Sequence, residues 1–414
     1  MVCGSRDEQG FKTILVTKPT HPYMAGWWPP GHMLAWEHSH THQIYHLMDC
    51  IGSDRMPEPS LLDGLKNQAV VEAMRQSIRD NSIGHFFPKR EVNKMKLGMF
   101  TVMMSDQPLE KILDLAVGYG MEAVEFGTGG FVGKAHCNPD ELLSDRSKLQ
   151  RLKAMVAERN LRISALSCHA NPLHPDDHIG PVHAADLRKT VLLAEQLEVT
   201  RVIGFAGCPA GCETDKMPNW VHEPWPDWFP QMLQWQWREK LIPFWTDMVK
   251  LARQHQVKHF CFELHPGDMV YNPESLFRLR ESVGEEICCN YDASNIEWQG
   301  IDTLAVIHEL GETIKHVHAK DSKIYKRHSA INGTLDPKPY DDLKRSWNFR
   351  TVGWGHGLEY WNEFVMNLRM IGYDDVLSIE HEDCLMSARE GLGKAVQFLT
   401  PILMKEKPGP MTWA

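Results

Sequence analysis

The chain has 414 residues, of which 43% are hydrophobic and 24% are charged, and it carries a net charge of −10 at pH 7. This composition is typical of a folded globular protein and excludes a mainly disordered or collagen-like chain. The acidic balance disfavours a nucleic-acid partner, because phosphate backbones are bound mainly by Lys and Arg. The apolar runs, such as 199–206, are far shorter than the roughly 20 residues of a membrane-spanning helix, so we expect no membrane span.

Ten cysteines are spread along the chain, and several of them lie inside apolar runs. We therefore expect reduced core thiols rather than a disulfide framework. The first residues lack the pattern of a secretory signal, so the predicted location is the cytoplasm. Cys208 and Cys212 could form a metal or redox pair. Their spacing is not CxxC and no second pair accompanies them, which disfavours that interpretation.

Residues 1–93 lack the alternation of strands and helices that follows, and we interpret them as an N-terminal, mostly helical appendage. Helical patterns occur around 43–51 and 61–83. The stretch 17–46 is dense in His, Trp and Pro but has no clean ligand spacing, which favours a structural role over metal binding. The motifs WWPPGH and DGLKNQ resemble the C-terminal tail of the Gfo/Idh/MocA family of NAD(P)-dependent sugar dehydrogenases. No GxGxxG follows a strand in this region, so we expect no NAD binding.

Eight short apolar runs follow one another between Lys96 and Glu380, each too short to be a helix. Segments with helical spacing separate them; in one, Leu109, Ile112, Leu113 and Ala116 fall on one face. Parallel strands joined by helical crossovers close most simply as an α/β (β/α)₈ TIM barrel, predicted here over 94–404 with a C-terminal tail at 405–414. A doubly wound open sheet is the alternative, but it usually has fewer strands. The eight runs begin at Lys96, Glu122, Arg162, Thr200, Lys258, Ile287, Lys315 and Val376.

Two long stretches interrupt the regular spacing. Residues 208–243 are rich in Trp and Pro, and residues 322–357 carry many charged and aromatic side chains. Both follow the C-terminal end of a strand, where the loops of a TIM barrel build the active site. The first stretch is equally compatible with a substrate pocket and with an oligomer contact. For the second we favour the site.

Four strands in the second half of the predicted barrel end on side chains that can bind a metal. They are Glu263, Asp292, His318 and Glu380. Burying these groups singly is costly, and a shared cation removes that cost. Three carboxylates and one imidazole without thiolates suit Mn²⁺ best, with Mg²⁺ or Co²⁺ as alternatives, rather than a structural zinc. Each residue alone has an ordinary structural explanation, such as an ion pair or a helix cap.

This constellation resembles the xylose-isomerase-like TIM-barrel superfamily of sugar isomerases and epimerases, over about residues 96–403. The resemblance implies that the four residues bind one divalent metal and that Glu263 and Glu380 also move protons on opposite faces of a sugar. His169, in SCHANP at the end of the third strand, resembles a position that the family uses near its substrate. A ketone makes the adjacent carbon acidic enough for such chemistry when a metal stabilises the enediolate.

Four further residues have side chains suited to hydroxyl or carbonyl recognition, and we predict that they bind substrate, although Lys320 could instead pair with Asp321 or Glu382. They are His265, Lys320, Arg350 and His356. The expected partners are a small sugar substrate, no nucleic acid and no membrane, with self-association or association with a dehydrogenase as further expectations.

The chain departs from the family at one informative position. Sugar epimerases and the related endonucleases usually have Asp-x-x-His after the sixth strand, whereas this chain has Asp292-Ala-Ser-Asn295. The missing histidine argues against a multi-zinc endonuclease. It also leaves three hypotheses open: an isomerase or epimerase of a keto-sugar or polyol, a lyase that eliminates or deglycosylates a 3-oxo-sugar, and a non-catalytic barrel that assembles with a dehydrogenase.

Overall fold

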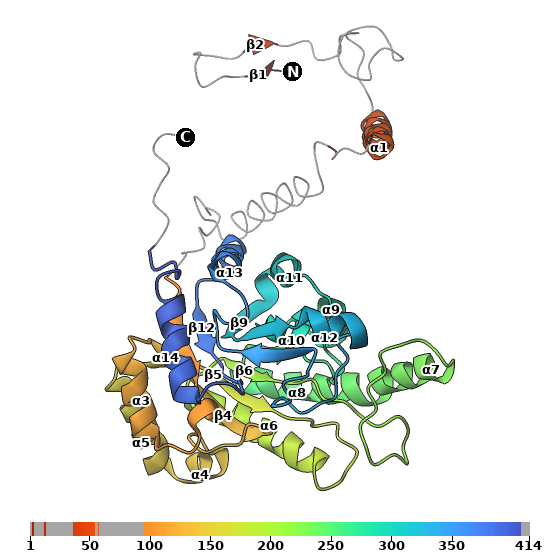
Figure 1. The fold of residues 1–414 in the computed structure, drawn as a ribbon. Helices are drawn as coiled ribbons and strands as arrows, with labels where there is room; N and C mark the ends of the chain where they lie inside the picture. Colours follow the sequence, from red (N-terminus) through yellow and green to blue (C-terminus); the bar gives the residue numbers. More distant parts are fainter. Residues whose placement is uncertain (1, 4–11, 14–35, 54–56, 58–93, 407–414) are drawn as a thin grey trace. The chain divides into compact units, whose positions relative to one another are not determined.

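The computed structural model describes residues 2–3, 12–13, 36–53, 57 and 94–406 of a chain that divides into two compact units, 1–91 and 92–414 (Figure 1). In the first unit, β1 (Val2–Cys3) pairs antiparallel with β2 (Lys12–Thr13), and α1 spans Trp36–Gly52. The helix predicted around 43–51 is thus confirmed as part of α1. The helix predicted at 61–83 and most of the dehydrogenase-like segment lie outside the described residues.

Eight parallel strands of the second unit form a closed barrel, which confirms the predicted TIM barrel. Each of the eight apolar runs supplies one strand. Around the barrel the order is β12-β3-β4-β5-β6-β7-β8-β9, so each strand from β3 to β9 lies beside its neighbour in sequence and β12 closes the ring. The strands are β3 (Lys96–Phe100), β4 (Ala123–Gly130), β5 (Arg162–His169), β6 (Arg201–Gly204), β7 (His259–Glu263), β8 (Ile287–Tyr291), β9 (Ile314–Ala319) and β12 (Val376–Ile379).

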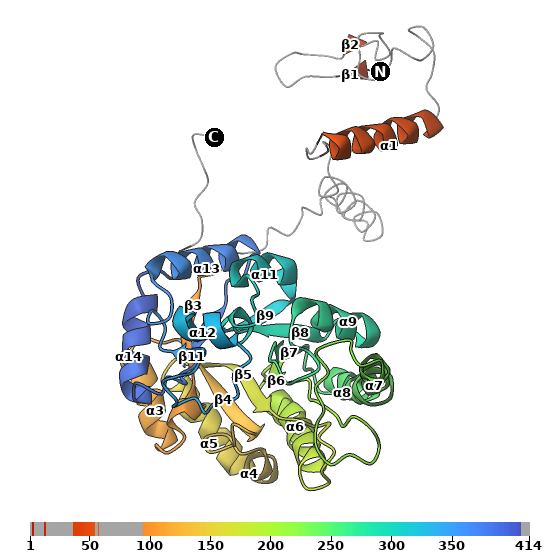
Figure 2. The same cartoon turned by 45° about the vertical axis from the view of Figure 1, so that its right-hand side comes forward.

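Helices surround the strands (Figure 2). α3 (Leu109–Gly118) buries Ile112, Leu113 and Ala116 on the face that its spacing predicted. α6 (Gly180–Gln196) has Pro181 in its first turn, a position where proline suits a helix start. The other helices of this unit are α4 (Pro139–Ser144), α5 (Arg146–Ala157), α7 (Trp228–Trp235), α8 (Ile242–Gln254), α9 (Pro273–Val283), α10 (Ser294–Glu297), α11 (Thr303–Leu310), α12 (Lys326–Asn332), α13 (Leu358–Met370) and α14 (Ala388–Leu399). None of the described helices is both long and apolar enough to cross a membrane.

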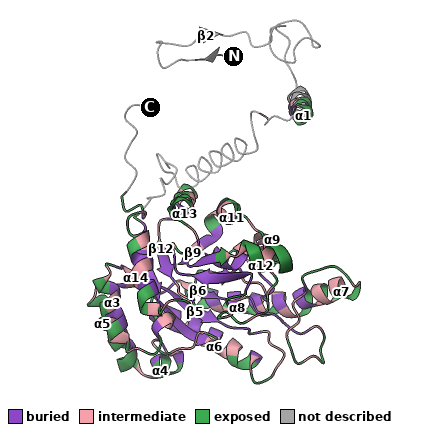
Figure 3. Cartoon of the chain, viewed as in Figure 1, coloured by how far each residue is buried: buried purple, intermediate pink, exposed green. Residues whose placement is uncertain are grey.

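The barrel strands are almost entirely buried (Figure 3). Their two faces differ because side chains alternate along a strand. Large apolar residues such as Phe260 and Phe262 of β7 face the helices, where both contact the Trp245 ring. A separate apolar cluster of Ala165, Ile203, Cys261 and Cys288 fills part of the interior. Cys261 and Glu263 are two residues apart on β7 and therefore lie on the same face of the strand. The Glu263 side chain thus also faces the barrel interior.

Both long stretches contain secondary structure that their composition did not indicate. In the first, α7 is followed by a π-helical turn, Gln236–Leu241, that leads into α8. In the second, β10 (Asp321–Ile324) pairs antiparallel with β11 (Trp347–Arg350), and α12 lies between them. Trp347 stacks on Trp298 at a ring distance of 4.7 Å, which holds this hairpin against the loop after β8. Such long-range pairing is invisible to local sequence patterns.

Candidate metal centre

The four predicted metal ligands converge at the C-terminal end of the barrel. One ligand atom from each of them lies within 4.8 Å of the ligand atoms of the other three. Glu263, Asp292 and His318 are buried, and the Glu380 side chain is 11% exposed. The geometry thus brings together side chains that are separated by up to 117 residues in the chain (380 − 263).

Glu263 is held by several donors. Its carboxylate accepts hydrogen bonds from the amides of Asn295 at 2.5 Å and Asn290 at 3.3 Å, and it lies 3.1 Å from Nε2 of His169. Burial alone would raise the pKa of Glu263, but the Lys320 ammonium, the hydrogen bond with His169 and the neighbouring His318 outweigh it and keep this pKa well below its ordinary value. The carboxylate is therefore fixed in place and ionised.

Asn295 occupies the position where the family usually has a histidine. Besides Glu263, its side-chain amide donates to Oδ2 of Asp292 at 2.9 Å. An amide carries no titratable proton, so Asn295 bridges and orients two carboxylates without transferring a proton.

Lys320 lies inside the same cluster rather than at its rim. Its Nζ is 3.0 Å from Asp292, from Glu380 and from Glu382, and 3.9 Å from Glu263. The ammonium also lies 4.6 Å from the centre of the Phe349 ring on β11. Burial would lower the pKa of Lys320, but the surrounding carboxylates raise it well above its ordinary value. Of the two alternative partners expected for Lys320, the structure selects Glu382.

The donor set suits a divalent cation. Nδ1 of His318 lies 3.0 Å from oxygens of both Glu263 and Glu380, yet it makes no hydrogen bond with proper geometry. Oε2 of Glu380 is buried and also makes no hydrogen bond, although the Lys320 ammonium lies 3.0 Å away. Buried polar atoms are rarely left without a partner. A shared ion requires ligand atoms that lie close together and are not hydrogen-bonded to one another. Three carboxylates and one imidazole favour an oxygen-preferring divalent ion.

The sequence predictions missed a group of residues that contact the predicted ligands inside the barrel. Glu125 on β4 lies with both carboxylate oxygens 3.0–3.1 Å from Nε2 of His318. Two residues before His318, His316 lies 2.9 Å from the amide oxygen of Asn290, and the amide nitrogen of Asn290 donates to Glu263. A charged residue within the apolar run of β4 was the available signal for Glu125, because a buried carboxylate needs a partner.

The remaining predicted site residues have different surroundings. The ring of His265 packs at 4.9 Å against Phe205, whose own ring is 4.8 Å from that of His169. Arg350 donates from Nη1 to Asp383 at 3.1 Å.

Both ring nitrogens of His356 lie beside carboxylates, Nδ1 at 2.8 Å from Asp321 and Nε2 at 3.1 Å from Glu297. These contacts occupy the polar atoms of His356, and the Arg350 contact anchors β11. Substrate binding by His265, Arg350 and His356 stays a prediction.

Nine cysteines, from Cys50 to Cys384, are free, as expected. Cys208 is buried, whereas Cys212 is exposed, and the sulfur of each lies beside a different oxygen, that of Pro209 and that of Thr214. The paired-cysteine interpretation of 208–212 therefore finds no support in their surroundings.

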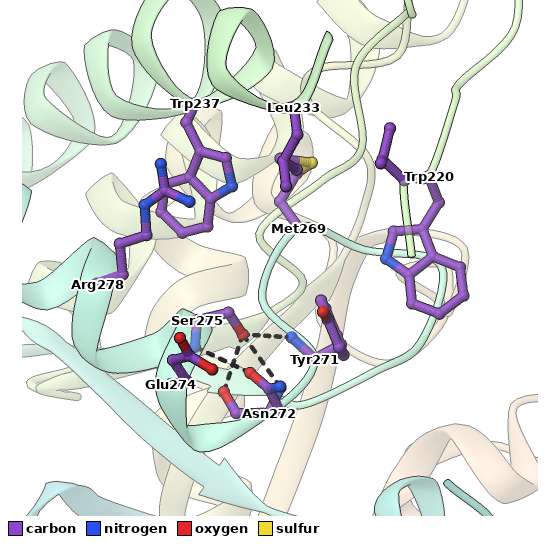
Figure 4. Close-up of a pocket in the computed structure, with 10 residues that line it drawn as sticks. Trp220, Leu233, Trp237, Met269, Tyr271, Asn272, Glu274, Ser275 and Arg278 are labelled. Carbon is purple, nitrogen blue, oxygen red and sulfur yellow. Dashed lines mark hydrogen bonds between the residues drawn. The ribbon is translucent and has the colours of Figure 1, made fainter. Parts of the chain in front are cut away.

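The Trp-rich stretch lines a cavity of about 160 Å³ between α7, the π-helical turn and the start of α9. In Figure 4, Trp220 and Trp237 lie on opposite sides of Leu233 and Met269. Arg278 stacks over Trp237 at 4.0 Å. None of the four predicted ligands lines this cavity. Gln299 links the two places, because its side-chain amide donates to the backbone oxygens of both Tyr271 in the cavity wall and Asn295.

The fold and the four converging residues agree with a match to a protein-family model. Residues 113–402 match the xylose isomerase-like TIM barrel family, and the chain belongs to this family.

Among curated proteins, the chain is 38% identical over 308 residues to an uncharacterized protein, YfiH, of Bacillus subtilis (strain 168). The match covers 74% of this chain and 98% of YfiH. Two solved structures share the fold. One is the probable 3-DHS dehydratase AsbF of Bacillus anthracis, at a TM-score of 0.54 and 17% identity, with 74% of this chain and 99% of AsbF covered. The other is the IolI protein with a bound zinc atom, at 0.52 and 16%, with 74% and 98% covered.

Proposed function

We propose that this protein is a divalent-metal-dependent isomerase or epimerase of a keto-sugar or polyol. The observation that carries the proposal is the convergence of Glu263, Asp292, His318 and Glu380 on one buried point. Family membership supports it, since the matching family is named for a sugar isomerase. The zinc bound by the similarly folded IolI protein supports a metal ion in this chain. We expect Mn²⁺ as the native ion.

A divalent ion at this point would supply positive charge to the carbonyl and hydroxyl oxygens of a keto-sugar, which makes the neighbouring C–H group more acidic. Glu263 and Glu380 then accept and return the carbon-bound proton. They are not equivalent. Glu263 is fixed by the two asparagine amides and His169, whereas Glu380 retains a buried oxygen without a hydrogen bond. Lys320, 3.0 Å from Glu380, is placed to donate to a substrate oxygen at the same point.

A lyase acting on a 3-oxo-sugar is the second candidate. Isomerase and lyase share the first step, the removal of a proton next to a ketone, and differ in whether the proton returns or a neighbouring substituent leaves. Asn295 favours the lyase, because it stands where an epimerase usually has a histidine and contacts both Glu263 and Asp292. The fold shared with a probable dehydratase points in the same direction.

The test combines metal analysis with proton exchange. Wild-type protein loaded with Mn²⁺ and incubated with a panel of keto-sugars in D₂O should incorporate deuterium at one carbon. Glu263→Gln and Glu380→Gln should each lower the exchange by about 10²- to 10⁴-fold, because an amide can ligate a metal but cannot accept a proton. Glu382→Gln is the matched control, since this carboxylate contacts Lys320 but is 48% exposed and lies outside the four ligands.

Three outcomes would contradict the proposal in different ways. Stoichiometric metal that remains after Glu380→Ala would place the ion elsewhere. Full exchange by both Gln variants in excess Mn²⁺ would make the glutamates ligands only and point to His169 as the base. Absence of exchange together with loss of dehydrogenase binding in the Glu380 variant would favour the non-catalytic scaffold.

A further inference from the structure

A layer of polar side chains fills the barrel interior directly beneath the four converging ligands. It is completely enclosed, since the layer residues are at most 3% exposed. Polar groups in such a place are costly unless each is hydrogen-bonded, so their arrangement carries information. The layer consists of Glu125, Ser164, Ser167, Asn290, His316 and Ser378.

Glu125 is the centre of this layer. Its Oε1 accepts from the Ser167 hydroxyl at 2.5 Å, and its Oε2 accepts from the Ser378 hydroxyl at 2.6 Å. Both oxygens also face Nε2 of His318, at 3.0 and 3.1 Å. An ionised carboxylate only accepts hydrogen bonds, so Nε2 of His318 must be the donor in this contact.

We propose that Glu125 is a positioning residue that orients His318 for the metal centre. By holding the hydrogen of the ring on Nε2, it leaves Nδ1 as the nitrogen that faces Glu263 and Glu380. Nδ1 is the atom that lies 3.0 Å from both carboxylates without a hydrogen bond. Carboxylate–histidine pairs of this kind fix the tautomer and ring orientation of metal ligands. The role in metal binding rests on the proposed function, whereas the position of the ring hydrogen does not.

The same residues could in principle hold a second ion, because Glu125, His316 and His318 also offer ligand atoms within 4.8 Å of one another. Their existing bonds argue against it. His316 has a partner at each nitrogen, Asn290 at 2.9 Å and Ser164 at 3.2 Å. Both oxygens of Glu125 already accept hydroxyl protons. The layer is therefore saturated with hydrogen bonds, in contrast to the centre above it, where two buried atoms lack them.

The test replaces the carboxylate by an amide of nearly the same shape. In Glu125→Gln, the Mn²⁺ dissociation constant, measured by calorimetry, should rise about 10- to 100-fold. The thermal melt and circular dichroism of the metal-free protein report whether the variant stays folded. Glu382→Gln, which removes a carboxylate from the edge of the centre, should leave the dissociation constant within about twofold.

A second measurement keeps the inference testable even if Glu125→Gln fails to fold. Nitrogen-15 NMR of the histidine rings in wild-type protein, both metal-free and loaded with diamagnetic Zn²⁺, should show a proton on Nε2 of His318 in each state. Ser378→Ala, which removes one support of Glu125, should speed the exchange of that proton with water. A bare Nε2 in wild-type protein, or a folded Glu125→Gln that binds Mn²⁺ within twofold of wild type, would overturn the inference. If wild-type protein binds no metal but Nε2 is protonated, the proposed metal function fails and the orientation of His318 by Glu125 stands.

Discussion

Replacing Lys320 by methionine probes the charge balance of the metal centre. The change removes the ammonium but keeps a long apolar side chain against the Phe349 ring. Lys320 lies 3.0 Å from each of three carboxylates and its side chain is 3% exposed. Breaking a buried charge cluster by removing one partner costs about 3–5 kcal/mol, because it leaves buried charge uncompensated. We therefore expect the free energy of unfolding in EDTA to fall by that amount.

Mn²⁺ should reverse much of this loss, because a divalent cation neutralises the same carboxylates. A ligand present at 100 times its dissociation constant stabilises a folded protein by about 2.7 kcal/mol. The gain should be larger for Lys320→Met than for wild type, since Lys320 repels the ion.

The assay is urea unfolding of both proteins in EDTA and in Mn²⁺. Lys250→Met is the control, because Lys250 pairs with Asp247 at 3.1 Å and the two side chains are 64% and 63% exposed, so its loss should cost less than about 1 kcal/mol. A Lys320→Met protein within about 1 kcal/mol of wild type in EDTA, or one that Mn²⁺ stabilises less than wild type, would refute this reasoning.

Three further predictions concern the surroundings of the centre. Asp321→Asn should lower the free energy of unfolding by about 2–4 kcal/mol in urea titrations, because Asp321 accepts three backbone N–H bonds from the 353–356 loop; a loss below about 0.5 kcal/mol would contradict this. Burial would lower the pKa of His356, but hydrogen bonds to Asp321 and Glu297 raise it to about 9. Its contribution to stability is then complete below the ordinary pKa of about 6.5 and disappears as the pH rises through 9, and His356→Gln should flatten that part of a stability–pH curve. Gly130→Ala should cost about 1–3 kcal/mol, because Gly130 has φ +68° and an added Cβ would collide with the carbonyl oxygen of His169; an unchanged melting temperature would show that the end of β4 can shift.

The number of barrel strands could be predicted from the sequence because each strand is a local apolar run. Parallel strands covered by helices on one side and packed inside the barrel on the other are buried throughout, so they appear as continuous apolar stretches. The β10–β11 hairpin could not be predicted in the same way. Its two strands are separated by α12 and held by Trp347 against Trp298, a contact that no local pattern records.

The candidate metal centre could likewise be predicted only in part. Glu263, Asp292, His318 and Glu380 could be predicted because each stands at the end of an apolar strand, and the carboxyl ends of parallel barrel strands meet at one mouth. The layer of polar side chains in the barrel interior could not be predicted. The role of Glu125 depends on its contact with His318, which is 193 residues further along the chain.

The sequence by itself determined the barrel and the four strand-end side chains that could bind a metal, since both follow from local patterns repeated along the chain. Only the tertiary structure decided that Lys320 belongs inside the carboxylate cluster, that His356 is bound between two carboxylates, and that Glu125 lies against His318. The physical reason is that a buried polar side chain takes its role from its partners, and closure of the barrel chooses those partners from strands that are distant in sequence.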